Sequence, residues 1–187
     1  MTVVYIIIGI VVILLIVFIT IYNGLVRRRN QVKNAWAQID VQLKRRYDLI
    51  PNLMETVKGY MQHERQTLEA VTKARNLAQN VASSGVGERA KAEGELSSAL
   101  ARLLVVVENY PDLKANQNFL ALQEELTSTE NKISFSRQYY NDSALRYNNQ
   151  TQMFPSSIVA SMTRFKASEF FEVTVAEERA APKVSFT

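Results

Sequence analysis

The sequence contains no cysteine and one histidine, and it has only six glycines and four prolines among its 187 residues. Without cysteine there is no disulfide framework and no thiolate metal site, which fits a reducing compartment. The lone histidine, His63, precedes Glu64 but lacks the second histidine, four residues later, that a zinc-protease helix requires. We interpret His63 as hydrogen-bonded between helices, with a role as a pH sensor as the alternative.

Motifs that carry catalysis are also missing. There is no Gly-rich phosphate loop and no Gly-x-Ser-x-Gly, and nothing marks any two carboxylates as an acid/base pair. The 22 basic residues exceed the 18 acidic ones by too little to favour nucleic acid, and no aromatic-basic string or zinc-finger spacing accompanies them. We therefore predict no enzyme activity, no cofactor, no metal and no nucleic-acid partner.

Charged side chains are absent from the first 26 residues. Within them, Val3 to Tyr22 form an apolar run on every helical face, long enough to cross about 30 Å of hydrocarbon. A cleaved signal peptide would need a basic start, a shorter core and a small-residue cleavage site. We interpret residues 1–26 as a transmembrane anchor.

Basic residues follow this anchor at once: Arg27, Arg28, Arg29 and Lys33. Such residues mark the cytoplasmic side of a spanning helix and are attracted to anionic lipids. The sequence thus predicts a single-pass protein of the cell membrane, with its N-terminus outside and its C-terminal domain in the cytoplasm.

Apolar residues spaced three and four apart predict helices over 30–82, 88–109 and 111–149, separated by a loop at 83–87 and a break at 110–112. Pro51 interrupts the first helix, either as a sharp kink or as a tight turn between two helices. With the turn, four helices alternate in direction. We predict an all-α fold, in which residues 27–150 form an antiparallel up-and-down four-helix bundle.

Residues 151–187 are predicted to form an amphipathic and extended segment. It begins with a short helix capped by Ser156 or Ser157, continues as a weak strand over 170–175 and ends in an irregular tail that contains Pro182. Its large apolar residues either dip into the membrane surface, make an oligomer contact or close the end of the bundle. They are Phe154, Ile158, Met162, Phe165, Phe170 and Phe171.

Three polar clusters mix charge with aromatic residues. Two interpretations stay open for them: interhelical hydrogen bonds that fix helix register, or a recognition surface. Their candidate recognition residues are Arg45, Arg46, Tyr110, Arg137 and Tyr139.

The chain resembles the LemA family from end to end. The resemblance lies in Tyr22–Val26, Ala35–Leu53, His63-Glu64, Ala74–Asn76, Glu108–Asn116, Phe119, Glu130-Asn131, Tyr139–Asn141 and Phe154-Pro155. It implies a single-pass membrane protein with a short outside N-terminus, a four-helix bundle and no enzyme activity. A relative among magnetosome proteins implies, by analogy, a role in shaping or organising membranes.

The function that we predict is a membrane-anchored scaffold that forms a homo-oligomer and organises either the membrane or a complex of membrane proteins. The span lacks a Gly-x-x-x-Gly pattern, so we expect self-association through the bundle or the C-terminal segment. The alternative is a sensor or adaptor that passes a membrane signal to a cytoplasmic partner.

Overall fold

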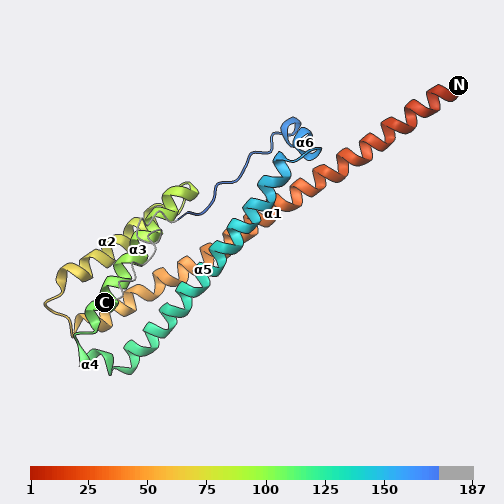
Figure 1. Cartoon of the computed structure of the whole chain (residues 1–187). Coiled ribbons are helices and arrows are strands. Elements are labelled where there is room, and N and C mark those ends of the chain that lie inside the picture. Colours follow the sequence, from red (N-terminus) through yellow and green to blue (C-terminus); the bar gives the residue numbers. More distant parts are fainter. Residues whose placement is uncertain (173–187) are drawn as a thin grey trace, which may run out of the picture. The chain divides into compact units, whose positions relative to one another are not determined.

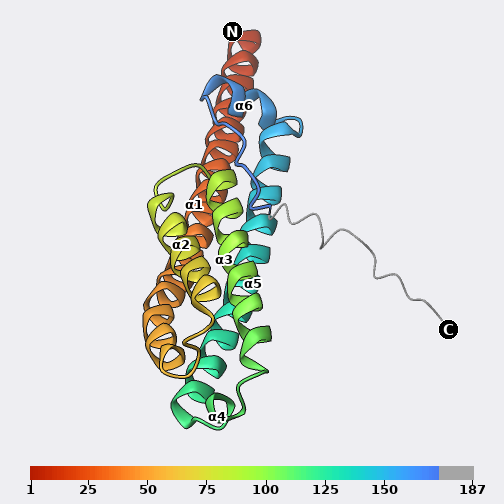
Figure 2. The same ribbon diagram turned by 90° about the vertical axis from the view of Figure 1, so that its left-hand side faces the viewer.

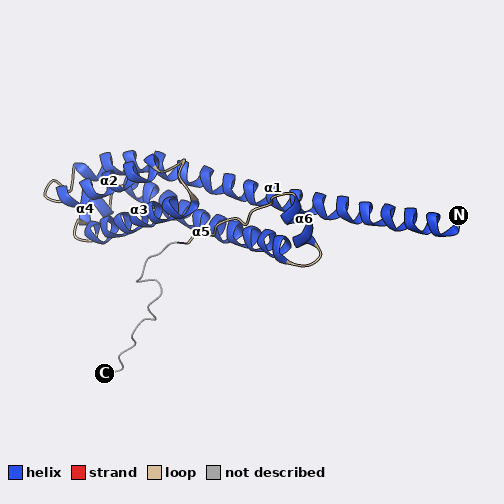
Figure 3. Ribbon diagram, turned by 90° about the horizontal axis from the view of Figure 1, so that it is seen from above, coloured by secondary structure: helices blue, strands red, loops and turns tan. Residues whose placement is uncertain are grey.

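The computed structural model describes residues 1–172 and contains helices joined by short connections (Figure 1). The helices are α1 (Thr2–Lys58), α2 (Arg65–Asn80), α3 (Val86–Val107), α4 (Pro111–Lys114), α5 (Gln117–Gln152) and α6 (Ser156–Met162). The described residues form no strand (Figure 3). The prediction of an all-α fold is therefore confirmed. Of the predicted weak strand, residues 170–172 are irregular, and the remainder lies outside the described residues with the tail.

The chain divides into two compact units, and both α1 and α5 contribute to each of them. Unit 1 consists of residues 1–41 and 134–170, and unit 2 contains residues 42–133. The predicted boundaries at residues 26 and 150 stay predictions.

Unit 2 is built from four helical segments that alternate in direction: the C-terminal part of α1, then α2, α3 and the first half of α5 (Figures 1 and 2). The helices α2 and α3 pack side by side. Each helix contributes one apolar stripe to the interior, as the three-and-four spacing predicted. The buried apolar residues include Leu43, Ile50, Leu53, Val57, Val71, Ala78, Leu96, Leu100, Leu103, Val107, Phe119, Leu126 and Ile133.

Helix α1 continues through Pro51 to Lys58, so the alternative of a turn at this proline is wrong. Proline has no N–H to donate to the carbonyl four residues back, which belongs to Tyr47. That carbonyl oxygen instead accepts a hydrogen bond from Nε of Arg75 on α2, at 3.0 Å. A partner from a neighbouring helix therefore satisfies the group that the proline leaves unpaired.

Two breaks fall where the sequence predicted continuous helix. The connection between α1 and α2 occupies residues 59–64, and a second break at 115–116 separates α4 from α5. At the second break the side-chain oxygen of Asn116 accepts hydrogen bonds from the backbone N–H groups of Asn118 (2.9 Å) and Phe119 (3.1 Å). This side chain caps the start of α5, because it satisfies two donors that have no partner inside the helix.

In unit 1, residues 2–41 of α1 run antiparallel to residues 134–152 of α5 (Figure 1). The rings of Trp36 and Tyr140 meet across this pair, with centroids 5.2 Å apart. The near-heptad stripe predicted for the last helix is buried here at Tyr140, Ala144 and Tyr147.

Helix α6 follows a short turn after α5. The expectation of a serine cap is wrong, because Pro155 holds the position before the helix. The hydroxyl of Ser156 instead donates to the carbonyl oxygens of Gln150 (2.6 Å) and Met153 (2.9 Å). This serine ties α6 back to the end of α5.

Candidate membrane-contact site

The first part of α1 presents apolar side chains that touch nothing else in the described structure. Residues 1–17 are all exposed, and large side chains such as Ile6 (61%) and Leu14 (62%) are more than half accessible. Within residues 1–172, α1 is the one helix long and apolar enough to cross a membrane, and the buried share of its most apolar stretch is zero. One N-terminal apolar helix of this kind fits a single-pass anchor.

Packing begins near the end of this apolar run. Leu25 is fully buried, and it forms one cluster with Val159 and Ala160 of α6. The partly buried side chains around this cluster are Phe18, Ile21 and Phe165. The inner face of α6 is thus attached to the last turns of the candidate span.

The predicted lipid-contact residues Arg27, Arg28, Arg29 and Lys33 are all exposed. The guanidinium of Arg29 lies 4.9 Å from the centre of the Phe165 ring, a cation–π contact. The same ring meets Tyr22 edge-on, with centroids 5.8 Å apart. Phe165 therefore joins the basic collar of α1 to the segment after α6.

The six apolar residues predicted for the membrane surface do not share one environment. Phe154 (81% exposed), Met162 (70%) and Ile158 (53%) face outward, and Met153 (63%) extends their patch. Of the other three, Phe165 is half-buried and Phe171 is buried, whereas Phe170 is exposed at 37%.

Two residues after α6, which ends at Met162, Arg164 has a left-handed conformation with φ of 57°. Around it, the backbone N–H of Phe165 donates to the carbonyl of Ala160 at 2.9 Å, which closes the helix end. Glycine adopts this conformation without strain, whereas another residue pays roughly 1 kcal/mol. An exposed arginine thus occupies, just after α6, a backbone position that suits glycine better.

The segment after α6 lies along α5 and is held by side chains of that helix. Asn148 donates to the carbonyl of Ser168 (2.9 Å) and accepts from its N–H (2.8 Å). The hydroxyls of Tyr147 and Tyr140 donate to the carbonyls of Lys166 and Glu169, each at 2.8 Å. Burial raises the pKa of both tyrosines. We call residues 166–169 the strap. The sequence did not predict these contacts, because the acceptors on the strap are backbone carbonyls, which every residue carries.

The polar candidates in unit 2 separate into buried and exposed members. The side chain of Arg46 is buried and forms ion pairs with Glu93 of α3 and with Glu130 of α5, the latter at 2.6 Å. It also donates to the hydroxyl of Ser97 at 2.8 Å. Arg46 therefore has the interhelical role, and it connects three helices of the bundle.

Tyr47, the neighbour of Arg46, donates a hydrogen bond from its hydroxyl to Glu93. Burial, then this bond to a carboxylate, raises the pKa of Tyr47 well above its ordinary value near 10. Arg45 points elsewhere and pairs with Glu125 while half-exposed.

The remaining candidates belong to different units of the chain. Tyr110 lies in unit 2 and donates to Glu64 at 3.3 Å, and its pKa is raised by desolvation and by that carboxylate. Tyr139 belongs to unit 1 and accepts from Gln31 at 3.4 Å, and Arg137 is half-buried in the same unit. His63 is exposed in the connection between α1 and α2, so the predicted bridge between two helices is wrong.

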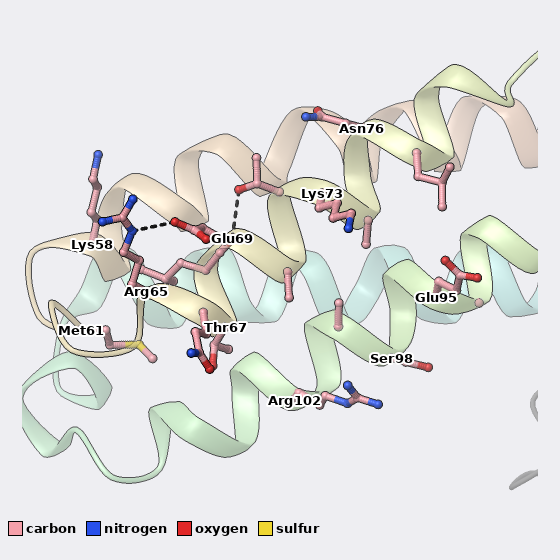
Figure 4. Close-up of a pocket in the computed structure, with 18 of the residues that line it drawn as sticks. Lys58, Met61, Arg65, Thr67, Glu69, Lys73, Asn76, Glu95, Ser98 and Arg102 are labelled. Carbon is pink, nitrogen blue, oxygen red and sulfur yellow. Dashed lines mark hydrogen bonds and ion pairs between the residues drawn. The ribbon is translucent and has the colours of Figure 1, made fainter.

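A groove of about 1810 Å³ lies between α2 and α3 in unit 2 (Figure 4). Small residues such as Ala70, Ala74 and Gly94 line it. Its charged lining is mainly basic, with five cations against two carboxylates: Lys58, Arg65, Lys73, Lys91 and Arg102 against Glu69 and Glu95. Arg65 and Glu69 pair with each other at 2.6 Å. The sequence contained no signal for this groove, because its two walls come from separate helices.

Comparison with known proteins agrees with the predicted resemblance. A family model described as LemA family matches residues 35–186. "Protein LemA" of Metamycoplasma hominis is 29% identical over 82% of the chain and 72% of that protein. "Magnetosome protein MamQ" of Magnetospirillum gryphiswaldense is 24% identical over 84% of the chain and 68% of that protein. "Magnetosome protein MamQ 2" of Paramagnetospirillum magneticum is 33% identical over 43% of the chain, which spans 30% of that relative.

Proposed function

Because this chain belongs to the LemA family, we propose that it is a membrane-anchored, non-enzymatic structural protein. In this proposal α1 holds the chain in the cell membrane, with the N-terminus outside and the helical bundle in the cytoplasm. The chain self-associates and organises the membrane, or a complex of membrane proteins, from that side. Its relatives among the magnetosome proteins support a membrane-associated role.

The observation that carries this proposal is the continuity of α1. A single uninterrupted helix includes both the exposed apolar run and the buried residues Leu43, Ile50 and Val57. A helix satisfies its own backbone hydrogen bonds inside lipid, so the same element serves in the membrane and in the bundle. The bundle is therefore attached to the bilayer by helix and not by a loose linker.

The distribution of charge supports the orientation. No carboxylate occurs in residues 1–39, whereas Arg27, Arg28, Arg29 and Lys33 lie directly after the apolar run. An excess of basic residues beside a span favours the cytoplasmic side for the segment that carries them.

Exposed apolar side chains on the bundle helices support self-association. Phe135 (71%), Val105 (69%) and Val41 (64%) are the clearest examples. Apolar side chains that remain in water are where a second copy gains most from contact. The span itself offers one glycine and no Gly-x-x-x-Gly motif, so the contacts are assigned to the helices beyond it.

The absence of native cysteine makes the test direct. A Thr2→Cys variant should react with a membrane-impermeant maleimide on intact cells, whereas a Ser84→Cys variant should react only after lysis. Full-length chains carrying one fluorophore each can be extracted in native nanodiscs and the fluorophores in each particle counted. We expect more than one chain per particle. Single copies in every particle would contradict the scaffold, and labelling of Ser84→Cys from outside would contradict the orientation.

A second candidate function, an adaptor for a cytoplasmic partner, is favoured by the basic groove between α2 and α3. Its excess of cations suits an acidic helical segment. The full chain carrying Lys73→Glu and Lys91→Glu should lose a stoichiometric partner that the parent retains. A Lys132→Glu variant, exposed and outside the groove, is the matched control and should retain it. Equal capture by all three chains would exclude this groove.

A further inference from the structure

The position of α6 along the candidate span sets its depth in a bilayer. Val3 to Tyr22 comprise 20 residues, which extend about 30 Å as a helix and match the hydrocarbon thickness. Phe18 and Ile21 lie in the last turns of that run, and they pack against the cluster formed by Leu25, Val159 and Ala160. If the run spans the bilayer, α6 must lie at the boundary between hydrocarbon and headgroups.

The outer face of α6 is apolar at this depth. Met153, Phe154, Ile158 and Met162 are between 53% and 81% exposed, while Val159 and Ala160 on the inner side are buried. A contiguous apolar patch of this kind marks a surface that is covered in the functional state. Because α6 packs against Phe18 and Ile21, the patch adjoins the exposed apolar run, so the bilayer that covers the run is the covering that the geometry favours.

The sequence segments that form the patch and the end of the span carry charge of one sign. Residues 1–39 and 143–168 contain seven of the 22 basic side chains of the chain and none of its 18 carboxylates. The rest of the chain is therefore acidic overall. Arg27, Arg28, Arg164 and Lys166 are exposed, and Arg164 occupies the left-handed position just after α6. Cations beside an apolar face are the pattern of helices that lie on anionic membranes.

We propose that residues 153–166 form a second membrane contact, in which α6 lies in the leaflet at the C-terminal end of the span. The side chains of Met153, Phe154, Ile158 and Met162 enter the boundary between headgroups and acyl chains. Arg27, Arg28, Arg164 and Lys166 bind anionic headgroups around them. This inference rests on the proposed anchoring of α1, and it adds a lipid-binding surface to the anchor.

A two-point attachment has a mechanical consequence. A single helix is free to rotate and tilt in a bilayer, and its orientation is set by neighbouring helices and interfacial anchors. Because α6 is packed on α1 and the strap after it is bonded to Tyr147, Asn148 and Tyr140 of α5, lipid contact at α6 fixes both helices of unit 1. Anionic lipid thereby controls the orientation of the helix pair.

The experiment uses the full chain with single cysteines, labelled with a nitroxide and reconstituted in vesicles of phosphatidylcholine with 30% phosphatidylglycerol. Labels at Phe154→Cys and Ile158→Cys should collide with oxygen in preference to a water-soluble nickel chelate. A label at Gln138→Cys, exposed on α5 of the same unit, is the matched control and should prefer the chelate. A label at Ile10→Cys reports the span itself.

Each outcome has a distinct meaning. Chelate access at residues 154 and 158 equal to that at residue 138 would overturn the proposal. Labels shielded from both reagents, with short distances between labels of two chains, would assign the patch to a second copy and also overturn it. Loss of the oxygen preference at residue 10 would instead overturn the anchoring on which the inference rests.

The role of the cations has its own readout. In the parent, removal of phosphatidylglycerol should reduce the immersion of the label at residue 158. With Arg164→Gln and Lys166→Gln together, immersion should depend less on phosphatidylglycerol than in the parent, because Arg27 and Arg28 remain. Circular dichroism should show that this variant is as helical as the parent. If its immersion then depends on phosphatidylglycerol as strongly as in the parent, these two side chains do not bind headgroups.

Discussion

The side-chain Nε of Arg75 donates a hydrogen bond to the backbone carbonyl oxygen of Tyr47, at 3.0 Å. The residue that would normally serve this carbonyl is four positions later, and it is Pro51, which has no N–H. A buried or half-buried carbonyl without a donor costs free energy comparable to a lost hydrogen bond. Arg75 thus allows a proline to occupy the interior of a helix that continues to Lys58.

A double-mutant cycle tests this relationship. Arg75→Ala should lower the free energy of unfolding by about 1–3 kcal/mol, since it leaves the carbonyl of Tyr47 without a donor. In a Pro51→Ala background the restored N–H serves that carbonyl, so the same substitution should cost clearly less. Denaturant titrations of the full chain in detergent, followed by circular dichroism, measure both. Equal costs in the two backgrounds would mean that the proline and the arginine act independently.

Arg46 provides the second prediction, because it pairs in the interior of unit 2 with Glu93 and Glu130. Arg46→Met keeps the apolar stem but removes the ion pair to the buried carboxylate of Glu93, which retains only its hydrogen bond from Tyr47 among the bonds described above. This loss should cost about 3–5 kcal/mol. Adding Glu93→Gln should recover part of that loss. Thermal unfolding of the full chain is the measurement.

The adjacent arginine is the control for this experiment. Arg45 pairs with Glu125 at the surface, where its side chain is 46% exposed. Arg45→Met should therefore change stability by no more than about 1 kcal/mol. A similar loss of stability in both variants would show that the burial of the ion pair does not determine its contribution to stability.

The raised pKa of Tyr47 predicts sensitivity to alkali. A folded pKa above the unfolded value of about 10 means that the stabilisation is complete below pH 10 and is lost as pH rises toward the folded value. In that window Tyr47 should contribute up to about 1.4 kcal/mol of lost stability per pH unit. The decline of stability between pH 10 and 12 should be shallower in Tyr47→Phe than in the parent. Parallel declines would contradict the assigned shift.

Asn148 predicts the behaviour of the strap after α6. It makes two hydrogen bonds with the backbone of Ser168, each worth about 1 kcal/mol. Asn148→Ala should therefore make the strap open at least tenfold more often, and trypsin should cleave after Arg164 and Lys166 correspondingly faster in detergent. Asn149→Ala, exposed one position later, should leave the cleavage rate unchanged. If the two variants are cleaved alike, the strap is held by other contacts.

The periodic parts of the fold followed from the sequence because burial in a helix recurs every three to four residues. The stripes from Val32 to Val57 and from Phe119 to Tyr147 are such cases, and so is the apolar run before Tyr22. The sequence pattern did not predict the breaks at 59–64 and 115–116. Asparagine is common at N-cap positions, but whether Asn116 caps a helix depends on the backbone geometry around it, which the residue type alone does not determine.

The candidate site was found only in part, and the reason is the same for each residue. In the sequence, five residues of this segment are similarly apolar. In the structure, Phe154, Ile158 and Met162 are exposed. Phe165 is half-buried against Tyr22 and Arg29, and Phe171 is buried. The short helix that carries them has too few turns for its periodicity to separate an inner from an outer face. The contact of α6 with Phe18 and Ile21, which gives the patch its depth, joins residues about 140 positions apart.

The sequence alone determined that the chain is helical, that one apolar run precedes a basic collar and that the family is LemA, since these depend on local composition and pattern. The tertiary structure decided that Pro51 stays inside a helix, that Arg46 is an interior ion-pair partner and that α6 rests on the end of the apolar run. Each of these depends on a partner supplied by a distant segment. A hydrogen bond, an ion pair or a packing contact needs two residues close together in space. In these three cases the two residues are far apart in the sequence, so no local stretch of it shows the contact.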